Sequence, residues 1–302
     1  MKAKQIARRV LGTPAVVVPL RWLNTNPRLS TDARHRLYLR VSRRVHPAPG
    51  TRFTHRRPGG ATLKLLLDGT LRELYWTGEY EADTLPLFAA YASRSATVLD
   101  VGAADGVYAL VAAAENPRAR VLAFEPGLHQ LDRLRHHVEA NRAVVGDRIE
   151  IIGVALSNQD GTARFYDSAS EGDSSLNADF RPGSTAREVT VARGDTVVAE
   201  RLAGTTPDPV RIDLVKIDTE STEPDVLDGL AGTIERDRPV IFCEVLAGRT
   251  EDRLQQRVDA WDYRTWWLGP DGPVRRDVIV GDPANRHVNW LFLPDDRPPP
   301  TP

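Results

Sequence analysis

From residue 61 onward, short apolar runs alternate along the chain with longer stretches in which apolar residues recur at helical spacing. The clearest runs are ATVLDVGA (96–103), ARVLAFEP (119–126), RIDLVKID (211–218) and PVIFCEVL (239–246). Their length and β-branched content predict buried strands. Strands that alternate with helices favour a mostly parallel sheet with helices on both faces, so the pattern predicts an α/β fold.

The remaining pattern completes this arrangement. Helices are predicted at 105–116, 127–142, about 223–237 and roughly 250–261, and a third strand at 148–157. GTARFYDS and REVTVARGDTVV then predict extra strands or a hairpin, joined by the polar loop 168–187. Two aromatic strands, YRTWWLG and HVNWLFLP, come last. The Gly/Pro/Asp-containing loop between them favours an antiparallel addition at the edge of the sheet.

Residues 1–60 differ from the rest of the chain in charge. They hold two Lys and twelve Arg against one Asp, whereas the remainder holds 26 basic and 40 acidic residues. The segment 46–60, rich in Pro, Gly and Arg, predicts a linker. We therefore expect a basic N-terminal arm over 1–60, one domain over 61–294, and a Pro-rich disordered tail over 295–302.

The apolar run at the start of the arm, VLGTPAVVVPL, is interrupted by glycine and proline and is too short to span a bilayer. No small-residue cleavage site follows it, so neither a cleaved signal nor a transmembrane helix is expected. Two interpretations of the arm stay open. It contacts anionic lipid or an acidic glycolipid at the inner face of the membrane, or it packs on the acidic domain or on a second subunit. Nucleic acid binding is disfavoured, because only Trp22, Tyr38 and Phe53 could stack on bases.

The chain has a single cysteine, Cys243, within the apolar run PVIFCEVL. One cysteine excludes an intramolecular disulfide and a cysteine-based zinc site. We expect a packed, unreactive thiol and a cytoplasmic location.

The segment LDVGAADGVYAL joins the first of these strands to a helix and carries the first candidate chemistry. Gly102, Ala104 and Gly106 keep the backbone open where a ligand must approach, and the helix N-terminus can receive an anion. A dinucleotide fingerprint requires Gly at position 104 and Gly or Ala at position 107, which here are Ala104 and Val107. Asp100 is better explained by a ligand amino group. The spacing therefore disfavours, but leaves open, a nicotinamide-dependent oxidoreductase.

Glu125 ends the second strand, nineteen residues after Gly106. An acidic side chain at this place can accept hydrogen bonds from both hydroxyls of a ribose. Together with the glycine loop, it predicts a site for a ribose-containing cofactor.

Five motifs occur in one order over about residues 72–294: VLDVGAADG, AFEP, VALSNQDG, LVKIDTESTEPDVLDG and VIFCEV. Together they resemble the FkbM family of S-adenosylmethionine (SAM)-dependent methyltransferases, and the string KID-x-E-x-x-E is the most specific part. The resemblance implies a class I methyltransferase fold, a Rossmann-like seven-stranded sheet with a reversed last strand. It also implies methyl transfer, usually to a hydroxyl oxygen. The basic arm lies outside it.

The resemblance also implies roles for particular residues. The loop from Asp100 to Gly106 would bind the methionine moiety of SAM, and Glu125 the ribose. Ala155 and Leu156 would flank the adenine, and Glu81, in WTGEYE, would close over the cofactor. Three positions depart from the family pattern: Ala104 replaces an Asn, Asp105 an apolar residue and Ser221 a glycine.

Candidate catalytic residues follow from strand ends, because ligands of doubly wound sheets lie beyond the carboxyl ends of the strands. Asp218 and Glu244 end neighbouring strands, so we expect them to flank the acceptor, one as base and one as orienter. His287 is a third candidate base. Asp218 and Glu244 would also suit Mg²⁺, but no third ligand with fixed spacing is evident, so a mechanism without a metal is favoured.

The acidic residues that follow Asp218 have different expected roles. Glu223 and Asp225 fall in the first turn of a predicted helix, where negative charge complements the helix dipole, and Thr222 could cap that helix. Glu220 stays open between loop organiser and site residue. The polar segment 170–180 resembles the family's variable insertion, so Ser174, Ser175 and Asn177 are either substrate contacts or loop residues.

The preferred function is an O-methyltransferase that acts on a hydroxyl of a saccharide, glycolipid or other small-molecule natural product. A second reading is a non-catalytic scaffold that binds SAM and associates with a membrane through its arm. Ala104 and Ser221 leave this interpretation open, because both depart from the family pattern. The identity of the acceptor does not follow from the residues.

Overall fold

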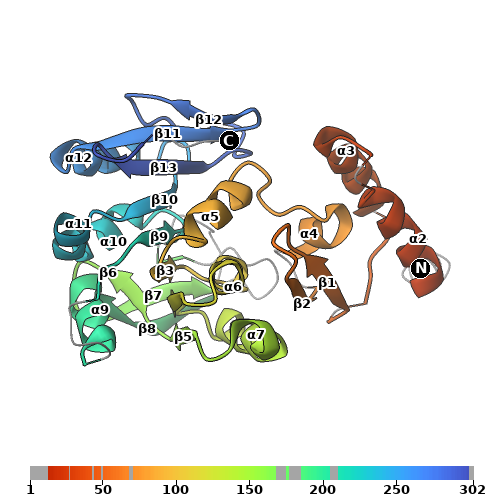
Figure 1. The fold of residues 1–302 in the computed structure, drawn as a ribbon, viewed down its shortest axis with the longest axis horizontal. Helices are drawn as coiled ribbons and strands as arrows, with labels where there is room; N and C mark the ends of the chain where they lie inside the picture. The colour runs from red at the N-terminus through yellow and green to blue at the C-terminus, as the bar shows by residue number, and fades with distance from the viewer. Residues whose placement is uncertain are drawn as a thin grey trace. The chain divides into compact units, whose positions relative to one another are not determined.

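The computed structural model describes residues 13–26, 28–42, 44–48, 50–67, 71–167, 175–176, 185–204 and 210–298. The chain divides into two compact units, Met1–Glu81 and Ala82–Pro302. Figure 1 shows the order of their helices and strands. Within the described ranges, no helix is both long enough and apolar enough to cross a membrane.

The N-terminal unit combines helices with a two-stranded ribbon. Its elements are α2 (Pro14–Asn24), α3 (Thr31–Ser42), β1 (Arg52–Arg56), β2 (Thr62–Leu66) and α4 (Arg72–Thr77). The segment 46–60, expected to be a linker, therefore contains a strand. β1 pairs with β2 in an antiparallel register that places Phe53 opposite Leu65, and both side chains are buried. This unit also extends to Glu81, beyond the boundary expected after residue 60.

Helix α2 is held within this unit by its polar residues. The Arg21 guanidinium lies 4.6 Å from the ring centroid of Tyr75, and its Nε donates a hydrogen bond to the Tyr75 carbonyl at 2.8 Å. Asn24 Nδ2 donates to the Trp76 carbonyl at 2.7 Å. Two large apolar residues of α2 face solvent, with Trp22 71% and Val18 61% exposed, whereas Val17 is buried. Both interpretations of the arm stay predictions.

The second unit is built on an eight-stranded sheet in the order β12-β11-β13-β10-β9-β3-β4-β5. Its strands are β3 (Thr97–Val101), β4 (Arg120–Phe124), β5 (Ile149–Ile152), β9 (Leu214–Ile217), β10 (Val240–Glu244), β11 (Tyr263–Gly269), β12 (Gly272–Arg275) and β13 (Asn289–Pro294). The run from β5 to β10 is parallel, and β13 is antiparallel to both β10 and β11. The predicted mostly parallel sheet with a reversed last strand is confirmed.

The two closing strands form the expected antiparallel addition at the edge of the parallel strands, with β13 between β10 and β11. The short strand β12, an eighth strand beyond the seven expected, forms the outer edge. All six residues of β13 are buried. A strand with no exposed residue is more stable between two neighbours than at an edge, where its backbone N–H and C=O groups would lack partners.

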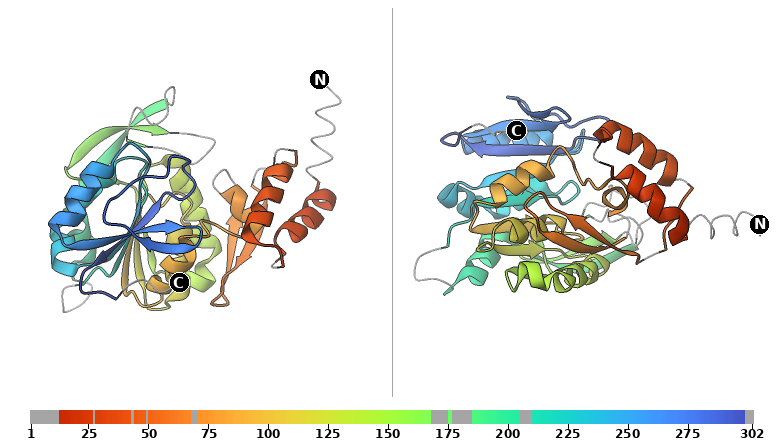
Figure 2. Two further views of the ribbon diagram at one scale, coloured as in Figure 1. Left: turned by 90° about the horizontal axis from the view of Figure 1, so that it is seen from above. Right: turned by 45° about the vertical axis from the view of Figure 1, so that its right-hand side comes forward.

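Helices cover both faces of the sheet, as Figures 1 and 2 show. They are α5 (Leu85–Ala92), α6 (Val107–Glu115), α7 (Leu128–Ala140), α8 (Arg142–Val145), α9 (Gly194–Leu202), α10 (Glu223–Gly229), α11 (Ala231–Asp237) and α12 (Glu251–Ala260). One core joins the sheet to α9, α10, α11 and α12. On α5, the Phe88 ring lies 4.7 Å from that of Tyr108 in α6 and 5.4 Å from that of Phe242 in β10.

Two predicted elements are each divided in the structure. The strand expected over 148–157 ends at Ile152, and its continuation β6 (Ala155–Ser157) belongs to a second sheet with β7 (Gly161–Asp167) and β8 (Thr185–Arg193). The helix expected over 223–237 divides into α10 and α11. Gly229, at the end of α10, packs so closely on β6 that a Cβ there would lie 1.9 Å from the Ser157 carbonyl oxygen.

Candidate active site

The glycine loop after β3 requires its small residues. Gly102 and Gly106 have φ of +80° and +78°, and Ala104 has a φ of +45°. A Cβ on Gly102 would lie 1.8 Å from the Asp218 backbone oxygen, and one on Gly106 would lie 2.3 Å from Leu134 Cδ1. The loop therefore packs directly on the end of β9 and on α7, and neither glycine has room for a side chain.

Two buried aspartates fix the start of α6. Asp100 Oδ2 accepts a hydrogen bond from the Ala109 amide at 2.9 Å. Asp105, which stands where the family has an apolar residue, accepts from Arg133 Nε at 2.5 Å. The arginine therefore compensates the charge of this departure. The contact between Asp100 and a ligand amino group stays a prediction.

Glu125 follows β4 and is buried beside the glycine loop. Its Oε2 accepts from the Ala104 amide at 2.9 Å and its Oε1 from the Gly127 amide at 2.6 Å. Burial raises the pKa of Glu125 to about 7, although the two amide hydrogen bonds oppose this shift. Each oxygen accepts one of these backbone hydrogen bonds and has two acceptor sites, so the carboxylate can also receive ribose hydroxyls.

The other residues expected near the cofactor fall in two places. Ala155 and Leu156 are both buried in β6, which pairs with β8. Glu81 is the last residue of the N-terminal unit and has a φ of +40°. The predicted roles of these three residues stay predictions.

Of the three residues expected to contact substrate, Ser174 and Asn177 lie outside the described residues. Ser175 is buried, and its Oγ donates a hydrogen bond to the Glu220 carbonyl at 2.6 Å. This hydroxyl therefore supports the loop that carries Glu220.

Carboxylates gather at the carboxyl ends of β9 and β10. One carboxylate oxygen from each of Asp218, Glu220 and Glu244 lies within 4.8 Å of the other two. The structure thus brings together the strand-end pair expected from the sequence and adds Glu220, whose role was open. We refer to these three residues as the acidic cluster.

Lys216, a residue that sequence reasoning missed, lies in β9 beside this cluster. Its side chain is 1% exposed, and Nζ donates to Asp218 Oδ2 at 2.9 Å and to Asn289 Oδ1 at 3.2 Å. The ammonium also lies 5.1 Å from the ring centroid of Tyr108. A lysine within an otherwise apolar strand run is the signal that could have identified it, because such a residue needs a buried partner.

The pKa values of two buried glutamates at this end of the sheet are raised. Burial, together with the neighbouring carboxylates of Asp218 and Glu220, raises the pKa of Glu244 well above its ordinary value. Burial likewise raises the pKa of Glu223. A carboxyl group with a raised pKa keeps its proton over a wider pH range. Without a cation beside it, Glu244 would therefore act as an orienting hydrogen-bond donor.

The two acids assigned to the helix start make different contacts. Glu223 Oε1 accepts from the amides of Thr219 and Ser221, at 3.1 and 3.0 Å, so this buried side chain organises the loop. Asp225 pairs with Arg253 at 2.5 Å. Thr222 precedes the helix but makes no side-chain cap hydrogen bond. Ser221 has a φ of +84°, the region that favours the glycine of the family pattern.

His287 lies just before β13, near the same edge of the sheet. Asn289, two residues later, pairs with Glu244 in the β-sheet register. His287 Nδ1 lies 2.6 Å from Asp83 Oδ2. Its backbone is held on both sides, since its amide donates to Asp282 Oδ2 at 3.2 Å and its carbonyl accepts from Trp267 Nε1 at 3.0 Å. Asp83, 204 residues away in sequence, was not identified from the sequence.

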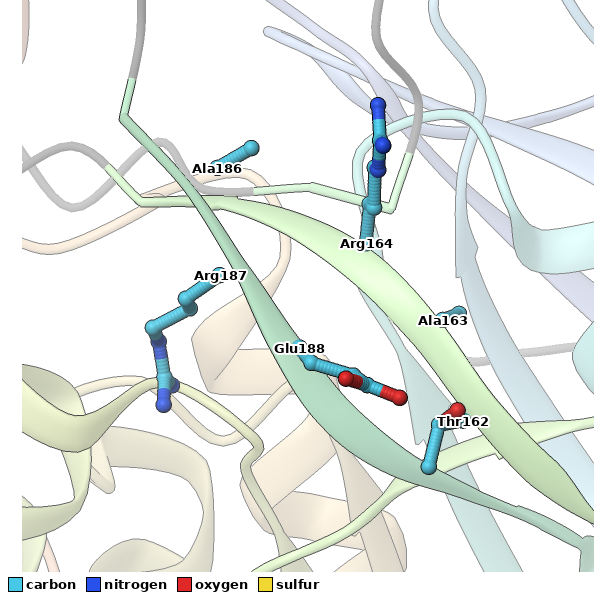
Figure 3. Close-up of a pocket in the computed structure, with 6 residues that line it drawn as sticks. All are labelled: Thr162, Ala163, Arg164, Ala186, Arg187 and Glu188. Carbon is cyan, nitrogen blue, oxygen red and sulfur yellow. The ribbon is translucent and has the colours of Figure 1, made fainter.

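A hollow of about 610 Å³ lies on the β7–β8 ribbon, and Figure 3 shows the residues that line it. They are Thr162, Ala163, Arg164, Ala186, Arg187 and Glu188. Arg187 also donates a hydrogen bond to the Pro126 carbonyl, next to Glu125. No residue predicted for the site lines this hollow.

The strand order and the site together define a class of protein. A mostly parallel sheet with a reversed last strand, a glycine loop after β3 and an acid after β4 are the features of a class I methyltransferase. The model of the methyltransferase FkbM domain matches residues 100–265. The chain therefore belongs to the FkbM methyltransferase family, which confirms the resemblance noted in the sequence.

Several individual proteins resemble this chain over part of its length. The AMB antimetabolite synthetase AmbE of Pseudomonas aeruginosa is 32% identical over 221 residues, which cover 61% of this chain. The chain spans about a tenth of the length of that relative, since the match covers 10% of it. A solved methyltransferase FkbM from Methylobacillus flagellatus KT has 16% identity and a TM-score of 0.44, over 74% of this chain and 52% of that one. The O-methyltransferase TomG from Streptomyces achromogenes, solved with SAM, has 11% identity and a TM-score of 0.39, over 72% and 81%.

Proposed function

We propose that this methyltransferase transfers the methyl group of SAM to a hydroxyl oxygen of a saccharide, glycolipid or other small-molecule natural product. The observation that carries the proposal is the direct packing of Gly102 on the Asp218 carbonyl. This contact joins the predicted cofactor loop to the acidic cluster. A methyl donor bound in the loop and an acceptor bound at the cluster would therefore be neighbours.

The residues around the loop suit SAM. Glu125 offers a buried carboxylate to the ribose, and it also holds the loop through the Ala104 amide. When bound, SAM supplies an electrophilic methyl group whose transfer breaks a carbon–sulfur bond. The nicotinamide alternative is less well supported, because Ala104 and Val107 depart from the dinucleotide spacing.

Transfer to a hydroxyl requires that its proton leave, and the three candidate bases are not equally suited. Asp218 already accepts a hydrogen bond from Lys216, and the raised pKa of Glu244 favours its protonated form. We assign the role to His287. The Asp83 carboxylate 2.6 Å from Nδ1 favours the tautomer in which Nδ1 carries the hydrogen and Nε2 can accept a proton. His287 would take the hydroxyl proton, while Asp218 and Glu244 orient the acceptor.

The test is incubation of the full chain with SAM labelled in its methyl group and with a cell extract. We expect one labelled class of product, in which mass spectrometry and hydrolysis place the methyl group on oxygen. Label on nitrogen or carbon would contradict O-methylation. SAM binding without transfer to any component would support the non-catalytic scaffold instead.

A further inference from the structure

We propose that Asp218, Glu220 and Glu244 bind a hard divalent cation such as Mg²⁺ or Ca²⁺. Binding of the ion does not depend on the proposed function, whereas its use in methyl transfer rests on it. A cation here would bind the acceptor oxygen and lower the pKa of its hydroxyl group, which eases loss of the proton to His287.

The geometry of the acidic cluster fits an ion. Its three ligand oxygens lie within 4.8 Å of one another and come from separate segments: the residue after β9, the loop that follows it and the end of β10. Oxygen-only ligands suit Mg²⁺, Mn²⁺ and Ca²⁺. At Ca²⁺ bond lengths of roughly 2.3–2.6 Å, three oxygens evenly spaced around one ion are at most about 4.5 Å apart, and at Mg²⁺ bond lengths of about 2.0–2.1 Å at most about 3.6 Å. The larger ion is therefore the better match to a spread of up to 4.8 Å.

A second observation is independent of the spacing. The Glu244 side chain is only 6% exposed, and its Oε2 has no hydrogen-bond partner among the described residues. A buried carboxylate without a donor is costly unless a positive charge compensates it. Since Glu244 lies within the cluster, this oxygen has the environment of an ion ligand.

Lys216 does not supply this positive charge to Glu244. Lys216 Nζ donates to Asp218 Oδ2 and to Asn289 Oδ1, and no hydrogen bond to Glu244 is found in the described part of the chain. The ammonium is therefore engaged with Asp218 and Asn289. A divalent ion would supply the positive charge beside Glu244 Oε2. The competing explanation is a proton held on Glu244.

Mn²⁺ provides the test, because its electron paramagnetic resonance signal falls when the ion binds. We expect the full chain to bind one Mn²⁺, with competition by Mg²⁺ or Ca²⁺ showing which ion the site prefers. Glu220→Gln and Glu244→Gln should each weaken Mn²⁺ binding by at least about tenfold, the lower end of what lost outer-shell partners cost metal sites. Asp252→Asn, at an exposed acid of α12, is the matched control and should bind as the unaltered chain does.

SAM binding by the same variants shows whether they fold and separates this proposal from the proposed function. Variants that bind SAM but not Mn²⁺ support the ion site. Equal Mn²⁺ binding by Glu244→Gln and the unaltered chain would overturn it. A second measurement needs no variant: Mg²⁺ or Ca²⁺ should raise the melting temperature of the unaltered chain relative to EDTA, by mass action. No rise with either ion would contradict the proposal.

Discussion

Replacing Gly102 by alanine is expected to destabilise the folded chain by more than about 4 kcal/mol and to abolish SAM binding. The new Cβ would lie 1.8 Å from the Asp218 carbonyl oxygen and 2.8 Å from its carbonyl carbon. Neither backbone can retreat easily. The Gly102 amide donates to the Phe124 carbonyl at 3.0 Å, and the Asp218 amide donates to the Val101 carbonyl at 2.9 Å.

Gly248→Ala is the matched control for this prediction. Gly248 has a φ of +72°, close to that of Gly102, but nothing lies within 4 Å of its Cβ position. The control therefore reports the cost of positive φ alone, about 1 kcal/mol. Denaturant unfolding and SAM calorimetry measure both variants. If Gly102→Ala were as stable as Gly248→Ala and still bound SAM, the close packing of loop and strand end would be wrong.

His287→Gln is expected to lower kcat by about 10²–10⁴-fold, the usual contribution of a positioned acid–base group. SAM affinity should be nearly unchanged, because the assigned cofactor residues lie at β3, β4 and β6. Asp83→Asn should cause a smaller loss, since the imidazole remains but loses the carboxylate 2.6 Å from its Nδ1. Single-turnover kinetics with the identified acceptor would measure both effects.

The control for the histidine variant is His129→Gln, at an exposed residue of α7. It should leave kcat unchanged. A pH–rate profile distinguishes a base from a merely structural residue, because loss of the base removes the acidic limb of the profile. Unaltered kcat in His287→Gln, combined with full loss in Asp218→Asn, would return the role of base to Asp218.

The sequence predicts much of this fold because its patterns are local. Apolar runs such as LVKI and VIFCE mark strands that are buried along their whole length. The glycine loop and Glu125 are likewise visible, because the chemistry of the cofactor demands small and acidic residues near strand ends. Cys243 is buried, as expected from its apolar surroundings.

The features that escaped prediction depend on contacts between distant segments. Asp83 and His287 meet from opposite ends of the domain, and Lys216 reaches Asn289 across 73 residues. The spacing of residues within a short motif carries no information on such pairs.

Calorimetric titration with SAM tests whether the cofactor binds at the glycine loop with its ribose on Glu125. Since burial raises the pKa of Glu125 to about 7, the carboxylate ionises between about pH 6 and pH 8. Because the ionised form accepts the ribose hydroxyls, SAM affinity should rise with pH through this window. The stability of the free chain should respond oppositely. A raised folded-state pKa contributes stability that is present at low pH and lost as pH passes about 7.

The same titration is then carried out on the Glu125→Gln variant. Loss of hydrogen bonds to a charged group, about 1.5–3 kcal/mol, should weaken SAM binding by roughly 10- to 100-fold and remove its pH dependence. NAD should not compete with SAM. Unchanged SAM affinity in Glu125→Gln, or binding of NAD in place of SAM, would contradict the account.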